Sequence, residues 1–504
     1  MRGLLLFFLF LGSVVFAQES PEKVLLKIKN EGFHNSKSMQ MLSTLTDHYG
    51  PRLTGSREYL AAAKWMKEQL TSFGLENVVL EETCNNCRGW SIKGFNVELV
   101  SPNYMNIIAY PLAMTKSSNG VVEGEVIQIK KWWQINEVKK QFTGKLKGKV
   151  ILMGSSKNTA DLTKTLQRRY KKDELIKLEE QIVPENNIEY LPDMVDDWLI
   201  SDRDDQAFFQ FLEDEGAIGV LTTNDSPPGL LRVEKTFYFL DNDYQPLPVF
   251  SIIPEHFGRI SRILAMGTIP KIKFFSDVEF YKEPKNHVNI LAEIKGTNPK
   301  YKSEVVLVGG HFDSWHASTG ATDNGVNVIV LAEALRILKA IGYKPKKTIR
   351  LGLWSGEEQA YYGSLNYAKR NFGELRSEPN TTSKTISAYL NLDNGAGSIR
   401  GIYLQGNEFA KPFFKKAFKT LEDITEGITT IENQPSSDHQ VFDHYNIPSF
   451  QLIQDPLAFY TMTLHTNMDV FEYVPKEDVL KNAVIMAWLL YSIAESEEMV
   501  PRKF

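Results

Sequence analysis

A repeated alternation of apolar, strand-like runs with helix-like runs occupies residues 285–504 and most constrains the fold. The strand-like runs include HVNILAEIKG, SEVVLVGG, KTIRLGLWS and ISAYLNLDN, and the helical stretches include NVIVLAEALRILKAIG and AYYGSLNYAKRN. Continuous apolar strands that alternate with helices are typical of a parallel sheet covered on both faces. The sequence therefore predicts an α/β fold with a largely parallel central sheet and helices on both faces.

The preceding segment, residues 120–284, has a different pattern of apolar and polar residues. Short β-rich runs such as VVEGEVIQI, GKVILMG and LPVFSII are separated by polar stretches, which indicates an inserted β-rich domain. Residues 18–119 contain two helical patterns and a strand, and we expect them to belong to the same domain as residues 285–504. A charged stretch at residues 163–197 is expected to form a solvated helix and loop.

The N-terminus has the layout of a secretory signal, with one arginine, an apolar run and a small-residue site before Gln18. We expect cleavage after Ala17, so that residues 1–17 form a signal peptide. The apolar run is shorter than the roughly 20 residues of a spanning helix, so no transmembrane anchor is expected. The predicted location is secreted, either periplasmic or extracellular.

Cys84 and Cys87 are the only two cysteines. In an exported chain a local disulfide is the expected state, with free thiols as the alternative. The formal net charge of −5 and the lack of a long Lys/Arg block argue against a nucleic-acid partner. The apolar run AVIMAWLLYSIAE near the C-terminus predicts a buried helix that is too short to span a bilayer.

Polar side chains follow three of the predicted strands. His311 and Asp313 follow the first, Glu357 and Glu358 follow the second, and Asp393 follows the third. In open α/β sheets ligands gather outside the carboxyl ends of the strands. Each group could instead be a hydrogen-bonding cap or a charged helix start. However, acids behind three buried strands would be costly to desolvate without a cation.

Two further residues complete a set of metal-ligand types. Asp323 lies twelve positions after His311, and His465 lies before the last predicted helix. Together with Glu358 and Asp393 these are two imidazoles and three carboxylates, a mixture suited to zinc. Because five ligands exceed one tetrahedral site, we expect two zinc ions about 3.5 to 4 Å apart, bridged by Asp323 and a water or hydroxide.

Several segments resemble a known family. HFDSW, ATDNG, SGEEQAYYGS, NLD and LHTNMD are similar to the metal-binding segments of the co-catalytic di-zinc exopeptidases, which include bacterial leucyl aminopeptidases and glutamate carboxypeptidases. The resemblance runs from about residue 30 to residue 501. YGPRLTGS and AESEEMVPR resemble the glutamate carboxypeptidases of the plasma type. Residues 120–284 resemble the protease-associated domain that is inserted in many members.

The resemblance implies a role for each matching residue. His311, Asp323 and Asp393 would hold one zinc, and Asp323, Glu358 and His465 the other. Glu357 would be the general base, and Asp313 would orient a ligand imidazole.

Three other polar residues lie near these motifs. His316 matches no ligand in the family pattern, and we interpret it as a pocket-rim or solvated loop residue. Asp438 and His439 correspond either to the substrate side or to an ordinary hydrogen-bonded loop. None of the three is assigned a part in the chemistry.

The resemblance implies a secreted zinc exopeptidase that hydrolyses dipeptides or short peptides by metal-activated water. Its closest alternative is an aminopeptidase of the same family. A single-zinc glutaminyl cyclase-like enzyme and a non-catalytic, receptor-like binding protein are two more distant alternatives. Similar proteins often form homodimers, so the resemblance also implies a homodimer.

Overall fold

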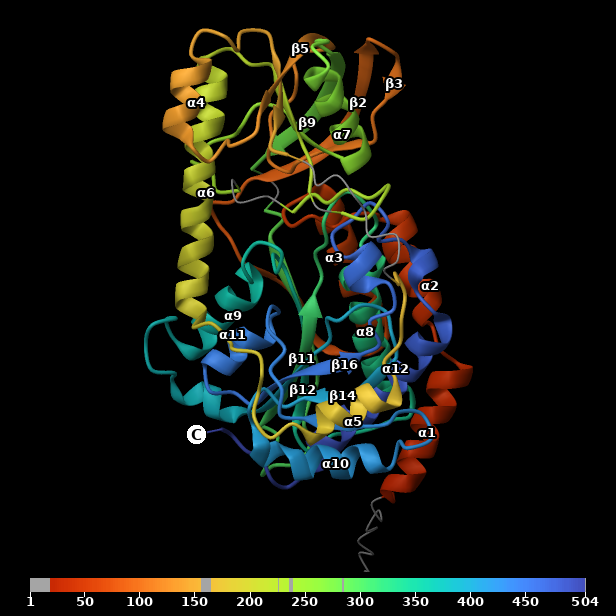
Figure 1. Ribbon diagram of the computed structural model, residues 1–504. Coiled ribbons are helices and arrows are strands. Elements are labelled where there is room, and N and C mark those ends of the chain that lie inside the picture. The colour runs from red at the N-terminus through yellow and green to blue at the C-terminus, as the bar shows by residue number, and fades with distance from the viewer. Residues whose placement is uncertain (1–18, 156–164, 225, 235–238, 283–284, 504) are drawn as a thin grey trace, which may run out of the picture.

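The structure, a computed structural model, describes residues 19–155, 165–224, 226–234, 239–282 and 285–503. It consists of two regions, each with its own eight-stranded sheet (Figure 1). The predicted signal peptide, residues 1–17, lies outside the described residues. Within the described ranges, no helix combines the length and apolar character that crossing a membrane requires.

The first sheet has the predicted parallel centre. In spatial order it contains β1 (Glu76–Glu82), β10 (Val288–Ile294), β12 (Thr348–Trp354), β11 (Val305–His311), β13 (Ile386–Asn391), β16 (Ser449–Gln454), β14 (Ile399–Tyr403) and β15 (Ile428–Thr430). Strands β12, β11, β13 and β16 are parallel, whereas β1 and β10 at one edge are antiparallel, as is β14 to β16. The α/β fold is thus confirmed, with antiparallel strands only outside its centre.

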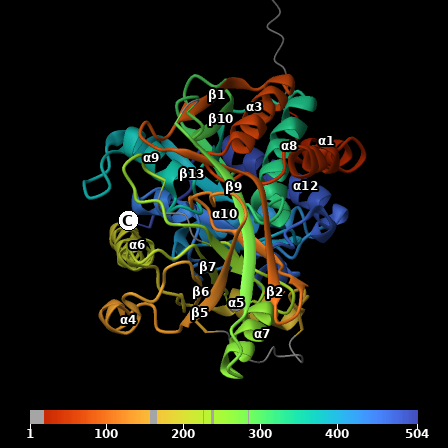
Figure 2. The same ribbon diagram turned by 90° about the horizontal axis from the view of Figure 1, so that it is seen from above.

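Helices cover both faces of this sheet (Figures 1 and 2). One face packs against α1 (Pro21–His34), α2 (Ser38–Ser43), α3 (Arg57–Ser72), α8 (Val326–Ala340), α10 (Lys411–Lys419) and α12 (Lys476–Glu495). The other face packs against α9 (Tyr362–Phe372) and α11 (His439–His444). Along β11, Val306 and Val308 belong to the first core and Val305 and Leu307 to the second. This two-sided burial is why the strand is apolar throughout.

The second sheet is inserted between two paired strands of the first. In spatial order it contains β3 (Met105–Asn106), β2 (Gly89–Ser101), β9 (Lys271–Tyr281), β5 (Val122–Ile129), β6 (Val150–Met153), β7 (Gly219–Thr222), β8 (Val249–Ile252) and β4 (Ala109–Pro111), with α4 (Ile135–Phe142) and α7 (Pro254–Ala265). Because β2 pairs along its length with β9, the sheet begins at Gly89 rather than at the expected boundary of residue 120. β1 and β10 pair directly although this whole region separates them in sequence.

A long helix, α6 (Leu191–Asp214), runs alongside both regions (Figure 1). Leu191 and Met194 pack into the core of the first region, and Phe208 and Leu212 pack into that of the second.

The charged stretch at residues 163–197 contains α5 (Lys172–Glu180) and a loop, and its described residues are mostly exposed, as expected. Arg169 anchors the stretch through ion pairs with the buried carboxylates of Asp455 at 2.8 Å and Asp478 at 2.7 Å. The expected solvated helix and loop is thus present in the described part, with anchoring contacts that the sequence did not predict.

Six short helical turns complete the chain: η1 (Thr44–His48), η2 (Ala321–Gly325), η3 (Thr381–Thr385), η4 (Glu408–Ala410), η5 (Phe459–Thr463) and η6 (Phe471–Tyr473). The expected disulfide between Cys84 and Cys87 is present, in the loop between β1 and β2. The C-terminal apolar run lies in α12, where most side chains are buried, as predicted.

Candidate metal centre

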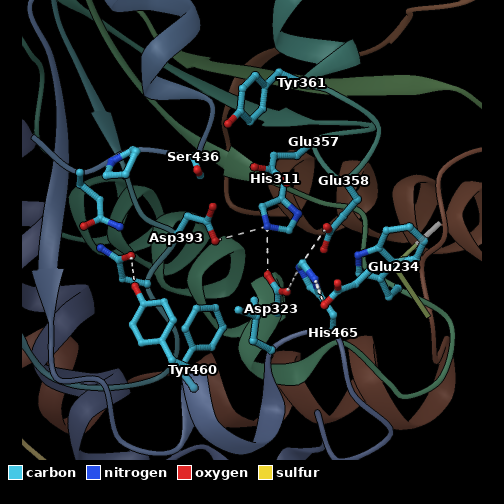
Figure 3. Close-up of a pocket in the computed structure, with 16 residues that line it drawn as sticks. Glu234, His311, Asp323, Glu357, Glu358, Tyr361, Asp393, Ser436, Tyr460 and His465 are labelled. Atoms are coloured by element: carbon cyan, nitrogen blue, oxygen red, sulfur yellow. Dashed lines mark hydrogen bonds and ion pairs between the residues drawn. The ribbon is translucent and has the colours of Figure 1, made fainter. Parts of the chain in front are cut away.

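Three neighbouring strands deliver polar side chains to one edge of the first sheet (Figure 3). β11 ends at His311, β12 is followed by Glu357 and Glu358, and β13 is followed by Asp393. β11 lies between the other two and runs parallel to both, so the three carboxyl ends meet.

Asp323 lies in the irregular turn η2, between β11 and α8. Its backbone N–H donates to Asp469 Oδ2 at 3.1 Å, and that of Thr322 donates to Asp469 Oδ1 at 2.5 Å. The carboxylate of Asp469, which is buried, therefore holds this turn in place. Asp469 belongs to the segment LHTNMD, but no role for it was predicted from the sequence.

His311 joins Asp323 to Asp393. Its Nε2 lies 3.2 Å from Asp323 Oδ1 and 3.3 Å from Asp393 Oδ1. The second carboxylate oxygen of Asp393 accepts a hydrogen bond from Ser437 Oγ at 2.6 Å. One imidazole nitrogen thus faces two carboxylates inside the protein.

His465 joins Asp323 to Glu358 in the same way. Its Nε2 lies 3.3 Å from Asp323 Oδ2 and 3.1 Å from Glu358 Oε2. Its Nδ1 lies 3.0 Å from Oε1 of Glu234, a residue of the second region. Each oxygen of Asp323 therefore faces one of the two imidazoles, which places this carboxylate at the middle of the cluster.

Asp313 lies behind the cluster, between His311 and the turn after β12. Its carboxylate accepts hydrogen bonds from the backbone N–H groups of Glu357 at 3.3 Å and Glu358 at 3.4 Å. His311 Nδ1 is 3.1 Å from the backbone oxygen of Asp313 but 3.6 Å from its carboxylate, which is too long for a hydrogen bond. Asp313 thus holds His311 through its main chain and the Glu357–Glu358 turn through its side chain.

The electrostatics of the cluster favour a positive charge. Burial alone would lower the pKa of His311, but the charge of Asp393 and contacts with Asp313 and Asp323 raise it well above its ordinary value. Glu358 has the same effect on the pKa of His465 against its burial. Burial raises the pKa of Glu358 to about 7 and that of Glu357 well above its ordinary range. These side chains therefore gain from any cation among them.

The donor atoms fit a metal ion. Ligand atoms of His311, Asp323 and Glu358 all lie within 4.8 Å of one another. Glu358 Oε1 is buried and has no hydrogen-bond partner among the described residues. Two imidazoles with three carboxylates form a nitrogen and oxygen set that zinc accepts.

Arg52, in the segment GPRLTGS, was assigned no role from the sequence. In the structure it stabilises the backbone next to the cluster. Its side chain is fully buried and donates to the backbone oxygens of Phe312, Thr319 and Gly320, each at 2.8 Å. These carbonyl groups belong to the loop between β11 and η2. Arg52 therefore fixes the path of the chain from His311 to Asp323.

The cluster opens into a cavity of about 540 Å³. Its lining residues are Glu234, His311, Trp315, Asp323, Glu357, Glu358, Tyr361, Asp393, Asn394, Gln434, Pro435, Ser436, Phe459, Tyr460, Leu464 and His465. Of the seven residues singled out from the sequence, all except Asp313 line this cavity. Aromatic and aliphatic walls beside a charged floor suit an organic substrate with a polar reacting group.

His316 does not reach this cavity. It is buried rather than solvated, and its Nε2 donates to the backbone oxygen of Pro111 at 2.7 Å, so the solvated-loop interpretation was wrong. Asp438 accepts a hydrogen bond from Ser364 Oγ at 2.5 Å. His439 Nε2 donates to the backbone oxygen of Gln434 at 2.7 Å, which supports one cavity wall.

Comparisons with known proteins agree with this site. Residues 289–489 match the family described as Peptidase family M28. Carboxypeptidase Q of Rattus norvegicus is 25% identical over 485 residues, which cover 96% of this chain and 91% of that protein.

Two solved structures share the fold. A Peptidase M28 precursor from Shewanella amazonensis SB2B superposes with a TM-score of 0.67 at 19% identity, covering 95% of this chain and 98% of that one. BSAP, a zinc aminopeptidase from Bacillus subtilis, gives a TM-score of 0.55 at 19% identity, covering 92% and 95%. The resemblance of the sequence motifs is thus supported by a match of residues 289–489 to the model of peptidase family M28 and by similarity along the chain to carboxypeptidase Q.

Proposed function

We propose that this protein is a di-zinc exopeptidase that hydrolyses dipeptides or short peptides, in the manner of carboxypeptidase Q. The observation that carries the proposal is the position of Asp323, whose two oxygens face one imidazole each, at 3.2 and 3.3 Å. Full-length similarity to carboxypeptidase Q supports the same substrate class.

Two metal sites would share Asp323. His311 and Asp393 would complete one, and Glu358 and His465 the other. When bound, zinc polarises the substrate carbonyl group and lowers the pKa of a coordinated water towards neutrality. The unpartnered Oε1 of Glu358 supports this assignment, since a buried oxygen without a hydrogen bond otherwise costs free energy.

Glu357 is proposed as the general base. It lines the cavity next to His311 (Figure 3), and Asp313 holds its backbone. Its carboxylate accepts a proton from the attacking water and donates that proton to the nitrogen of the leaving amine. A carboxyl group in a buried site holds a proton more readily than in water, which suits the second step.

Replacement of the base tests this function. Glu357→Gln should keep both zinc ions, measured by atomic emission, and lower kcat by about 10²- to 10⁴-fold. The exposed Glu378→Gln, with the same loss of charge, is the matched control and should retain the parent rate. Parent-like turnover of Glu357→Gln would show that another group is the base.

An aminopeptidase is the second candidate, and one observation favours it. The described residues that line the cavity include five carboxylates and no lysine or arginine. Such a lining suits the ammonium group of a peptide N-terminus better than a C-terminal carboxylate.

Three tripeptides separate these two directions: one free, one acetylated at the N-terminus and one amidated at the C-terminus. A carboxypeptidase cleaves the acetylated peptide and rejects the amide, whereas an aminopeptidase does the reverse. A strict dipeptidase cleaves none of them but hydrolyses free dipeptides. The identity of the released residue, measured by mass spectrometry, provides an independent check.

Export through the predicted signal peptide and assembly into a homodimer are part of this proposal. The disulfide between Cys84 and Cys87 supports an oxidising compartment. Mass spectrometry of secreted protein should find Gln18 as its first residue. Analytical ultracentrifugation should give twice the mass of the processed chain.

A further inference from the structure

One side chain from the second region reaches the metal centre. Glu234 lies in the long loop between β7 and β8, whereas every other charged residue that lines the cavity comes from the first region. Figure 3 shows Glu234 beside His465, on the side away from His311. Glu234 is thus the point where the inserted region touches the cluster.

Glu234 contacts Nδ1 of His465, the ring nitrogen that faces away from the cluster. Its Oε1 lies 3.0 Å from Nδ1 as an ion pair whose geometry falls short of a hydrogen bond, while Nε2 faces Asp323 and Glu358. Arg232 Nη1 lies 3.3 Å from the same Oε1. An imidazole whose Nδ1–H donates to a carboxylate has a fixed ring orientation and leaves Nε2 free as a ligand.

His465 has little support from its own backbone. It follows η5 in a loop and adopts a left-handed φ of 59°, which is uncommon for residues other than glycine. Its side chain is 23% exposed, against 1% for His311. Its orientation therefore depends on its contacts.

The loop that carries Glu234 is itself anchored. Leu231 and Val233 are buried in the core of the second region. Leu231 N–H donates to Asn467 Oδ1 at 3.0 Å, and Asn467 N–H donates to Leu231 O at 3.3 Å. Arg232 also forms a backbone bridge with Thr466. The two loops are thus joined at residues 231–232 and 466–467, just before Glu234 and directly after His465.

We propose that Glu234 is a positioning residue: by holding its carboxylate against Nδ1 of His465 it sets the zinc affinity of the Glu358–His465 half of the site and makes that affinity depend on the inserted region. This inference rests on the proposed role of His465 as a ligand. Loss of such a supporting carboxylate should weaken zinc binding about 10- to 100-fold at this half only.

Zinc titration of the metal-free full chain, in competition with a chromogenic chelator, tests the proposal. Glu234→Ala should weaken one of the two binding events about 10- to 100-fold, the one that His465→Ala also affects, and leave the other unchanged. Glu234→Gln should recover part of the affinity, because its amide oxygen is an acceptor that can occupy the same position beside Nδ1. Glu213→Gln, in the same region and ion-paired with Lys116, is the matched control and should bind zinc as the parent does.

A second measurement distinguishes the positioning role of Glu234 from a general effect on protein stability. In the zinc-loaded protein the Nδ1–H of His465 should give an imidazole proton signal by NMR that Glu234→Ala loses and Glu234→Gln keeps. Parent-like zinc affinity in Glu234→Ala would overturn the inference. Equal weakening of both binding events, together with a lower Tm of the metal-free variant, would also overturn it.

The variant His465→Ala separates a failure of this inference from a failure of the proposed function. If His465→Ala still bound two zinc ions with parent affinity, His465 would not be a ligand, and both proposals would fall. If His465→Ala lost one ion while Glu234→Ala matched the parent, only the inference about Glu234 would fall.

Discussion

The two halves of the metal centre are built in contrasting ways. His311 is the last residue of a central strand, its side chain is 1% exposed, and its carboxylate partners come from the same region. His465 lies in a loop, is 23% exposed, and contacts Glu234 of the inserted region. One half takes its geometry from the sheet, whereas the other takes it from the contact between two regions. Two proposed ligands of the same type can therefore differ in how firmly they are held.

The largest test of this contrast compares His311→Ala with His465→Ala. In both variants kcat should fall by more than about 100-fold, which corresponds to a loss of several kcal/mol of transition-state stabilisation. In the metal-free protein, however, His311→Ala should lower the free energy of unfolding by about 3 to 5 kcal/mol, because Asp323 and Asp393 lose their buried partner. His465→Ala should cost less than half of this, since water reaches its site. Urea unfolding measures both, and equal losses would contradict the contrast.

Acidification should weaken the junction between the regions, on which the His465 half depends. Burial lowers the pKa of His287 and of His316 to about 4, and both lie where the two regions meet. In the unfolded chain these two imidazoles take up a proton near pH 6.5, whereas in the folded protein they stay neutral down to about pH 4. The stability that the neutral imidazoles contribute is therefore complete above pH 6.5 and is lost as the pH falls towards 4. The loss is up to about 3 kcal/mol for each residue.

Urea unfolding of the metal-free protein between pH 7.5 and 4.5 checks this expectation. His316→Gln can still donate to the backbone oxygen of Pro111 but cannot be protonated, so it should show a shallower fall of stability with acid. A variant that falls as steeply as the parent would exclude His316 as a source of acid sensitivity.

A smaller effect is expected from Arg52→Lys, which alters the support of the His311 half. Lysine cannot reach the three carbonyl groups that the guanidinium binds, so we expect a loss of about 2 kcal/mol in unfolding free energy. Arg57→Lys, at an exposed ion pair with Glu279, should change stability by less than about 0.5 kcal/mol. Similar losses in the two variants would mean that Arg52 does not specifically support this half.

The residues at the strand ends were predictable because their side-chain types and their positions in the expected fold both indicate a metal site. The apolar strand-like runs predict a parallel sheet. The polar residues that follow them, His311, Glu358 and Asp393, predict that potential ligands meet at the carboxyl ends of its strands. The inserted sheet was harder to delimit. β2 precedes the β-rich stretch in sequence, and its pairing with β9 joins residues about 180 positions apart. The ion pairs that anchor the charged stretch at Arg169 were not predicted because their partners, Asp455 and Asp478, are distant in sequence.

The sequence alone determined the α/β class and predicted the residues that the structure brings together in the candidate metal centre, because these depend on periodicity and on the types of side chain that chemistry requires. Only the tertiary structure decided which groups hold the ligands in place. Glu234 lies 231 positions from His465, and Asp469 is one acid among many. A carboxylate acquires such a role through its position in space, and the long-range packing that sets this position leaves no local pattern in the chain.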